Sequence, residues 1–460
     1  MTGNHRFAIQ HFSGTLMQPG DAGYDDARRV FNGMIDRRPA AIARVASADD
    51  VARAIRFARD AGLTISVYGG GHGLTGAAVV DGGLCIDMRG MKCVDVDPAA
   101  RTVRVEGGAN WGEFDAATQA HGLAVTGGRN PSTGVAGLTL GSGSGWIERK
   151  YGFVCDNLFK IEVVTADGRQ VVASDGENPD LFWGLRGGGG NFGVVTAFHL
   201  RLHPLGSVLT GPLMYPPQMA AAVLRNYRDF MAKAPDEVCG GVVFTTAPDA
   251  PFVPPPARGK PVVLVNVVYA GDPAEGEKVL APLRAFGPPV ADLVHPASYL
   301  EVQAGAPNPW GNQQYSTADY MRELPDEAIE VLAGHALDPV SPETAIVIIP
   351  GGGAPSRVPE EATAFGARNA PFNIHYLAAW TNPADNVKNI ARVKAIAATM
   401  KPWATGRSYL NFLSDDVENR LAESFGEKKL ARLQALKRVW DPENIFRHNQ
   451  NIKPATVAAE

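Results

Sequence analysis

The first 205 residues alternate between two hydrophobic periodicities. The segment SADDVARAIRFARDAG (47–62) spaces its apolar residues three and four positions apart, starts with a capping Ser or Asp and ends in glycine, which predicts a helix. TISVYGG (64–70) and the runs between residues 77 and 108 are rich in β-branched residues and are interrupted by Asp-Gly-Gly and Asp-Pro, which predicts short strands. Strand-like runs continue to residue 174. The pattern favours one α+β unit with several glycine loops.

The pattern of hydrophobic and polar residues changes at about Leu205. Four segments then predict helix, strand, strand and helix in turn: PPQMAAAVLRNYRDFMAKA (216–234), GGVVFTTA (240–247), KPVVLVNVVYAG (260–271) and PAEGEKVLAPLRAFG (273–287). Such an order is typical of a second domain in which helices cover a sheet. Two later amphipathic segments predict helices, NVKNIARVKAIAATMKPW (386–403) and ENRLAESFGEKKLARLQALKRVW (418–440).

Composition narrows the class of protein. The chain has 460 residues, of which 45% are hydrophobic, so it can bury a large core in two or three domains. Its 43 basic and 48 acidic residues give a net charge of −5, which favours neither nucleic acid nor an anionic membrane as partner. The four cysteines form no CxxC pair and the histidines show no metal-ligand spacing, so we expect no metal site. No signal or membrane segment is evident, which predicts a cytoplasmic protein.

Glycine clusters carry the strongest functional signal. VYGGGHGLTG (67–76) matches G-x-G-x-x-G, but strands rather than a helix are predicted after it, which argues against an NAD-binding fold. Bare backbone amides in such loops suit the oxygens of a phosphate-bearing ligand. His72 lies inside the densest cluster, where an imidazole acts as a hydrogen-bonding group, a general base or a nucleophile. The spacing alone leaves these three roles open.

Several motifs in order give the chain a family resemblance. The stretches 67–76 and 128–146, RKYGFVCDNL (149–158), NPDLFWGLRGGGGNFGVV (178–195) and YLNF…VWDPENIFRHNQNI near the end resemble the FAD-linked oxidases of the vanillyl-alcohol-oxidase/p-cresol-methylhydroxylase superfamily, in its berberine-bridge-enzyme-like bacterial branch. The resemblance runs from about Asp21 to Lys453. It implies an α+β fold with a two-part FAD-binding domain over 1–205 (core about 37–205), an antiparallel-sheet substrate domain covered by helices over 206–405, and a C-terminal segment, 406–460, that returns to the FAD domain.

The resemblance also implies where FAD is held. His72 matches the histidine that bonds covalently to the flavin 8α-methyl carbon, and it is the only attachment expected. The other matching cofactor positions are Tyr68, Gly69, Gly70, Gly71, Gly73, Thr133, Gly134, Gly137, Leu138, Gly141, Ser142, Asp156, Asn157, Gly193, Val194, Val195 and Asn449.

Three positions depart from the family pattern. Asn130 occupies the place of the cysteine that makes a second flavin bond in bicovalent members, and Cys155, further along, is expected to be a buried small residue. Thr133 stands where members carry a Val or Leu that controls oxygen access, which leaves oxidase and dehydrogenase behaviour open. Phe412 replaces a tyrosine that serves as base in plant members.

The base must therefore come from another residue. The catalytic candidates are Tyr409, Asn411, Tyr376 and Tyr315, with Tyr320 and His375 as further possibilities for the base. A tyrosine, with a pKa of ~10, needs that pKa lowered by a neighbour to accept a proton near neutral pH. Three tryptophans are candidates to line an apolar substrate pocket: Trp310, Trp380 and Trp403.

These observations predict an FAD-dependent oxidoreductase. The expected reaction is that of an oxidase, in which a hydride passes from an alcohol or amine carbon of a small organic molecule to covalent FAD and then to O2. One alternative is a flavin dehydrogenase with another electron acceptor, and a second is a flavoprotein that binds or detoxifies a drug-like molecule. The expected partners are a small-molecule substrate and O2, with neither nucleic acid nor membrane.

Overall fold

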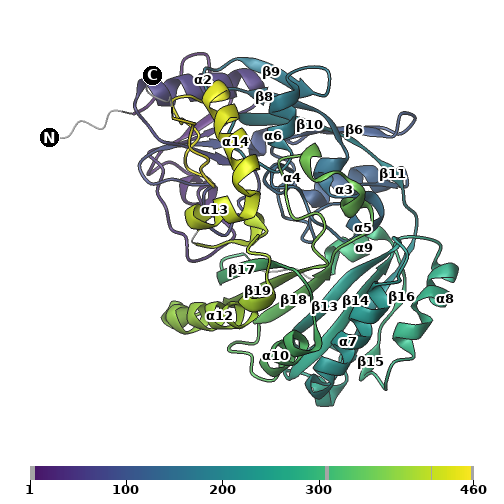
Figure 1. The fold of residues 1–460 in the computed structure, drawn as a ribbon. Helices are drawn as coiled ribbons and strands as arrows, with labels where there is room; N and C mark the ends of the chain where they lie inside the picture. Colours follow the sequence, from purple (N-terminus) through teal and green to yellow (C-terminus); the bar gives the residue numbers. More distant parts are fainter. Residues whose placement is uncertain (1–5, 306–309, 416, 457–460) are drawn as a thin grey trace.

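The computed structural model describes residues 6–305, 310–415 and 417–456. Figure 1 shows the N-terminal part of the chain at the top, together with the C-terminal helices, and a large sheet with its own helices below. Within the described ranges, no helix is long and apolar enough to cross a membrane.

A four-stranded sheet begins the N-terminal part, in the order β1-β2-β4-β3. The strands are β1 (Thr15–Met17), β2 (Ala41–Arg44), β3 (Ile65–Tyr68) and β4 (Leu84–Asp87), and only β1 runs antiparallel to its neighbour. The predicted helix is confirmed as α2 (Ala48–Asp60), capped where the Ser47 side chain accepts a hydrogen bond from the Asp50 N–H. The chain leaves it at Gly62, whose φ of +66° suits glycine.

The glycine loop after β3 leads to a strand and not to a helix. Residues 69–83 contain no helix, and β4 follows them. The prediction that this loop does not open a dinucleotide-binding helix is confirmed.

A five-stranded antiparallel sheet completes the N-terminal part, in the order β5-β6-β10-β8-β9. The strands are β5 (Val94–Asp97), β6 (Thr102–Glu106), β8 (Leu158–Val164), β9 (Gln170–Ser174) and β10 (Val194–Arg201). The helices beside it are α3 (Trp111–Gln119), α4 (Val135–Leu140), α5 (Glu148–Tyr151) and α6 (Pro179–Leu185). A shared core holds them together, with Trp111, Phe114, Phe182 and Phe198 among its largest side chains.

The central part of the chain forms an eight-stranded antiparallel sheet. Its order is β15-β12-β14-β13-β18-β19-β17, with β16 also paired to β12. The strands are β12 (Val208–Tyr215), β13 (Val238–Thr246), β14 (Pro261–Tyr269), β15 (Ala291–Asp292), β16 (His295–Ala297), β17 (Gln313–Met321), β18 (Ala345–Pro350) and β19 (Phe372–Trp380). The predicted strands and helices after residue 215 are confirmed as β13, β14, α7 (Ala220–Met231) and α8 (Pro273–Arg284).

Four helices of the central part cover one face of the large sheet. They are α7, α8, α10 (Asp326–Ala336) and α12 (Asn386–Met400), and their apolar side chains form one core with that face (Figure 1). Alternate residues of β17, such as Ala318 and Tyr320, belong instead to the core of the N-terminal part. We call this second face, over β17, β18 and β19, the inner face.

A polar clip joins the two parts of the molecule. Helix α9 (Tyr299–Ala304) lies against α3, and Gln303 Nε2 donates to Asp115 Oδ2 at 2.7 Å and to Gly128 O at 2.9 Å. Both side chains are buried. Because burial disfavours the carboxylate, the pKa of Asp115 rises to about 7.

The C-terminal segment packs on the N-terminal part (Figure 1). The segment 418–440, predicted as continuously helical, contains two helices, α13 (Val417–Phe425) and α14 (Glu427–Trp440), because Gly426 between them has a φ of +75°. At the end of α14, Lys437 and Asp441 form a fully buried ion pair at 2.7 Å. Lys437 also donates to Asn191 O at 2.7 Å, so this ion pair fastens the tail to the N-terminal part.

Candidate active site

The glycine loop after β3 presents a row of unused amide groups. The N–H groups of Gly70, Gly71, His72 and Gly73 donate no hydrogen bond to any described residue. Gly70 packs directly on Gly134, so that a Cβ on Gly70 would lie 2.2 Å from the Gly134 nitrogen. Two loops far apart in sequence thus meet backbone to backbone. Successive free amides of this kind form a concave site for anionic oxygens.

His72 sits in an aromatic and polar enclosure. Its ring stacks on Phe31, with centroids 4.1 Å apart, and meets the edge of Trp310 at 5.5 Å. Its Nε2 atom lies 2.8 Å from Ser132 Oγ, and its Nδ1 atom lies 3.5 Å from Thr133 Oγ1. Burial lowers the pKa of His72 to about 4. The imidazole is therefore neutral near pH 7 and keeps a lone pair on one ring nitrogen.

The glycine loop that contains Gly134, which we call the second glycine loop, leads into α4 and contacts the C-terminal tail. Gly137 of α4 is exposed, whereas Val135 and Leu140 on the same helix are buried. Beyond the helix, the Asn411 amide lies against Gly141, where a Cβ would be 2.2 Å from Asn411 Oδ1. Asn411 Nδ2 also donates to Leu138 O at 3.3 Å. The predicted residues 134–142 and Asn411 are thus brought together.

Tyr409 is buried at the junction of the tail, α4 and the large sheet. Its hydroxyl oxygen accepts hydrogen bonds from the Ser144 N–H and from Asn411 Nδ2, both at 3.1 Å. Burial nevertheless raises the pKa of Tyr409 above its ordinary value, in spite of these bonds. This shift is opposite to the one that a base needs near neutral pH.

His375 faces Tyr409 from the inner face. Its ring centroid lies 4.0 Å from that of Phe412 and 6.3 Å from that of Tyr409. Burial lowers the pKa of His375 to about 3, so it is neutral. Among the described residues, its buried Nε2 atom has no hydrogen-bond partner. An unpaired buried nitrogen here indicates a position that a polar ligand can satisfy.

The structure does not bring Tyr315 and Tyr376 to this site. Both belong to the helix-covered core of the large sheet, on the face opposite His375. Tyr315 donates to Asp415 Oδ1 at 2.5 Å. Tyr320 does lie on the inner face, where its ring packs against Phe365 and burial raises its pKa well above the ordinary value.

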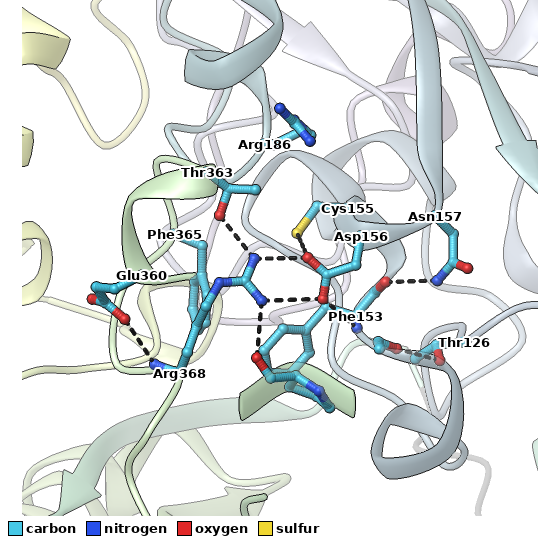
Figure 2. Close-up of polar contacts among 12 residues, drawn as sticks. Thr126, Phe153, Cys155, Asp156, Asn157, Arg186, Glu360, Thr363, Phe365 and Arg368 are labelled. Carbon is cyan, nitrogen blue, oxygen red and sulfur yellow. Dashed lines mark hydrogen bonds and ion pairs between the residues drawn. The ribbon is translucent and has the colours of Figure 1, made fainter. Parts of the chain in front are cut away.

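Asp156 and Asn157 are engaged in contacts within the protein (Figure 2). The Asp156 carboxylate accepts from both terminal nitrogens of Arg368, at 2.7 and 3.1 Å, and from the Phe153 N–H at 3.0 Å. Asn157 Nδ2 donates to Phe153 O at 2.9 Å. Cys155 beside them is buried, as expected. These side chains hold the 153–157 turn against the loop that carries Arg368.

The remaining predicted residues lie in or beside strands of the N-terminal part, except Asn449, which lies in the tail. Tyr68 donates to Arg29 O at 2.6 Å, and burial raises its pKa to about 12. Gly193 directly precedes β10 and has no space for a side chain, because a Cβ there would be 2.5 Å from Val163 Cγ1. Val194 and Val195 are buried in β10. In the tail, Asn449 Nδ2 donates to Gly190 O at 3.1 Å.

Phe31 and Ser132 join the site although the sequence assigned them no role in it, and Asn130, expected only to lack the second flavin bond, joins it as a hydrogen-bonding residue. Phe31 lies far from any glycine motif and had no local signal. The Asn-Pro-Ser sequence did carry one, because an Asn side chain commonly bonds to the backbone two residues on, as Asn130 Oδ1 does here with the Ser132 N–H at 2.9 Å.

The described residues fit an FAD. The free amides of the first loop suit its pyrophosphate, and a neutral imidazole stands beside them. Near the second loop and in the tail, Thr139 Oγ1 and Asn449 Oδ1 are buried without a partner among the residues described. A bound group or an ordered water satisfies such atoms.

Comparison with known proteins agrees with this fit. The profile of the family "FAD binding domain" matches residues 39–174, and that of "Berberine and berberine like" matches residues 408–453. The (R)-6-hydroxynicotine oxidase of Paenarthrobacter nicotinovorans is 33% identical over 467 residues, which cover 96% of this chain and 97% of that protein.

Solved structures give the same result. The 6-hydroxy-D-nicotine oxidase from Arthrobacter nicotinovorans superposes with a TM-score of 0.87 at 31% identity, covering 96% of this chain and 98% of that one. BBE-like 1 of Physcomitrella patens has a TM-score of 0.87 at 24% identity, covering 97% and 98% of the two chains, which supports the fold alone.

Proposed function

Because the chain belongs to the FAD-linked oxidoreductases with a berberine-like C-terminal segment, we propose that it is an oxidase of a small organic amine or alcohol, with FAD bonded to His72 alone. When bound, FAD supplies the redox chemistry: it accepts a hydride and passes the electron pair to dioxygen. The observation that carries the proposal is the neutral His72 beside a row of free amides.

The N-terminal part and the tail hold the cofactor in this proposal. Residues 1–205 with 406–460 form the FAD domain, and residues 206–405 form the substrate domain. The amides of residues 70–73 bind phosphate oxygens. The positions around them line the cofactor: Tyr68, Gly69, Thr133, Gly134, Gly137, Leu138, Gly141, Ser142, Gly193, Val194, Val195 and Asn449. Asp156 and Asn157 stabilise the site rather than bind the cofactor with their side chains, because these side chains are already hydrogen-bonded within the protein.

The inner face contacts the substrate in this proposal. In cross-strand register it presents Gln314, Ser316, Ala318 and Tyr320 from β17, Val347 and Ile349 from β18, and Asn373, His375, Leu377 and Ala379 from β19. None of these ten side chains carries a charge at neutral pH, since His375 is neutral. The ten side chains themselves thus offer hydrogen bonds and apolar contacts, and an ion pair with the substrate would come from neighbours such as Glu148 and Arg368, which line a cavity together with Tyr320, Ile349 and Asn373.

Tyr409 and Asn411 orient the substrate. With its raised pKa, Tyr409 keeps its proton and acts as a hydrogen-bonding hydroxyl, while Asn411 holds it in place. Removal of a hydride from a neutral amine gives an iminium without prior loss of a proton, whereas an alcohol must also lose its hydroxyl proton. Because Tyr409 and His375 are both poor bases here, an amine is favoured over an alcohol. Tyr315 and Tyr376 take no part, because they lie on the other face of the sheet.

Two measurements test this function. Acid-precipitated protein should stay yellow, and His72→Ala should release all of its flavin on precipitation. Candidate amines and alcohols are then added under anaerobic conditions. The active substrate should bleach the flavin absorbance of the protein, and admission of air should restore that absorbance rapidly. Slow recovery in air would instead support a dehydrogenase, and tight binding without bleaching would contradict an enzymatic role.

A further inference from the structure

A small cavity lies between the inner face and Glu148. Its walls include Tyr320, Ile349 and Asn373 from the inner face, together with Ser144 and Glu148 from the N-terminal part. The space that water-sized molecules can occupy is about 30 Å³, enough for about two water molecules. A small terminal group of a bound molecule fits there, whereas an aromatic ring does not.

Glu148 has one carboxylate oxygen in use and one without a partner. Oε2 accepts a hydrogen bond from the Ser144 hydroxyl and another, at 2.8 Å, from the Gly145 N–H. Oε1 accepts none from the described residues. The nearest cation among them, a terminal nitrogen of Arg129, lies 3.7 Å from Oε2, beyond hydrogen-bond distance. Because Glu148 is only 7% exposed, a donor in the cavity is needed to satisfy its unused oxygen.

Asn373 and Tyr320 bring further unused polar groups to the wall. They lie opposite each other on β19 and β17. Asn373 Oδ1 is buried and has no hydrogen-bond partner in the part of the chain that the structure describes. The Tyr320 hydroxyl makes no hydrogen bond to that part either. Both oxygens can accept from a bound group, as Glu148 Oε1 can, so acceptors from three residues line the same small space.

The cation in the wall is already paired. Arg368 donates from both terminal nitrogens to the Asp156 carboxylate, at 2.7 and 3.1 Å (Figure 2). Arg149, next to Glu148 in the chain, is not part of the wall and donates to two backbone carbonyl oxygens. Within the wall, the charge left without a hydrogen-bonded counter-ion is that of Glu148. The cavity therefore favours a cationic or neutral donor over an anion.

The cavity lies near the reacting end of the site. The His375 ring faces Tyr409 and Phe412, and Asn373 precedes it by two residues on the same face of β19. Two residues of an antiparallel strand span about 7 Å. Ser144 connects the two places, because it lines the cavity and its N–H donates to the Tyr409 hydroxyl at 3.1 Å. A molecule that reacts beside Tyr409 can therefore reach the cavity with its far end.

We infer that this cavity binds a small hydrogen-bond donor, an ammonium or a hydroxyl group, at the far end of the substrate, and that Glu148 is its acceptor. The inference rests on the proposed oxidase function and narrows its substrate class. The substrate is a small amine or alcohol with a second donor group about 7 Å from the carbon that is oxidised. Glu148 thereby determines specificity without contacting the reacting atoms.

Three probes that differ only at their far end test this preference. They are cadaverine, its analogue with a hydroxyl in place of one amino group, and pentylamine, which ends in a methyl group. Calorimetric titration of the full-length holoprotein gives their dissociation constants, with the flavin photoreduced under anaerobic conditions so that no probe is oxidised. We expect cadaverine and the hydroxyl analogue to bind about tenfold more tightly than pentylamine, the factor for one hydrogen bond to a charged group. The tighter of the two identifies the preferred donor.

Glu148→Gln replaces the free oxygen with an amide donor and keeps one oxygen for Ser144 and Gly145. The preference for cadaverine over pentylamine should disappear, while pentylamine binds as before. Glu330→Gln, which removes an exposed carboxylate of α10, is the matched control and should keep the wild-type preference.

Asn373→Leu is a second test that leaves the hydrogen bonds of Glu148 intact, and it decides the question if Glu148→Gln does not fold. Loss of the Asn373 amide should weaken binding of both donor-bearing probes about fivefold, the factor for one neutral hydrogen bond. A wild type that binds neither of these probes, or binds all three equally, would overturn the inference. A preference that both variants retain would overturn it as well.

The measurement separates this inference from the proposed function, because binding is observed without turnover. A substrate that bleaches the flavin, with no preference among the three probes, would refute the role of the cavity alone. A clear preference in a protein whose flavin no amine or alcohol bleaches would refute the oxidase function and leave the binding site standing.

Discussion

Gly70 and Gly134 touch backbone to backbone, and a methyl group on Gly70 would lie 2.2 Å from the Gly134 nitrogen. Gly70→Ala should therefore force the two glycine loops apart. Overpacking of this kind costs about 1–3 kcal/mol of stability, and retention of FAD should fall with it. Thermal unfolding and the flavin-to-protein absorbance ratio measure the two effects.

Gly73→Ala is the matched control for this contact. A Cβ on Gly73 meets no atom within 4 Å, and its N–H group is kept. We expect wild-type stability from this variant. Equal losses in both variants would show that the contact between the loops is not the cause.

The hydrogen bonds of the Tyr409 hydroxyl lead to a second prediction. If Tyr409 is a neutral hydrogen-bonding group, Tyr409→Phe should lower kcat/KM about tenfold, the worth of one good hydrogen bond to the substrate. The pH profile between pH 6 and 9 should keep its shape, because the raised pKa of Tyr409 places its ionisation above this range. Loss of an ionisation step from the profile would instead identify Tyr409 as the base.

The buried pair Lys437–Asp441 should be a main anchor of the tail. Asp441→Ala leaves a buried ammonium without its partner, and we expect a loss of about 3–5 kcal/mol in the free energy of unfolding. Urea denaturation measures it. The exposed pair Lys278–Glu275 has the same 2.7 Å separation, and Glu275→Ala should cost below about 1 kcal/mol. Comparable losses would mean that burial of the first pair is unimportant.

Asp115 should make stability depend on pH. Its folded pKa of about 7 lies above the unfolded value of 3.8, so the folded state binds the extra proton and stability falls as the pH rises between these values. Asp115→Asn cannot ionise, and its amide oxygen can still accept from Gln303. We expect the variant to gain about 3–4 kcal/mol relative to wild type between pH 4 and pH 8.

Urea unfolding of both proteins across this pH range isolates Asp115, because other titrating groups are common to the two chains. The difference between them should grow up to about pH 7 and then stay constant. A difference that does not change with pH would mean that the clip to Gln303 holds the carboxylate in its charged form.

Local signals in the sequence were sufficient for many elements. The Ser or Asp cap, which the structure places at Ser47, the apolar spacing and Gly62 predicted α2 closely, because all three act within one segment. The break at Gly426 was missed, since α13 and α14 both carry an amphipathic pattern and only the positive φ separates them. The three strands of the inner face were also not predicted individually.

Long-range contacts account for what the sequence did not predict at the site. Period-two alternation places His375 and Tyr376 on opposite faces, but only the packing of α12 determines which face is covered. Phe31, Ser132 and Trp310 meet around His72 from three distant positions. The sequence of residues 130–134 showed that the cysteine of bicovalent members is absent. The partners of Ser132 could be identified only from the three-dimensional structure.

The tail has a consequence for the order in which the protein is made. Asn191 Oδ1 accepts from the Ile452 N–H at 3.0 Å, and Leu433, Leu436 and Ile452 fill the core that the N-terminal strands share. While residues 427–452 are still untranslated, this core stays incomplete, even though the glycine loops left the ribosome long before. FAD loading is thus expected to be a late, post-translational event, and a prematurely terminated chain would expose apolar surface that chaperones and proteases recognise.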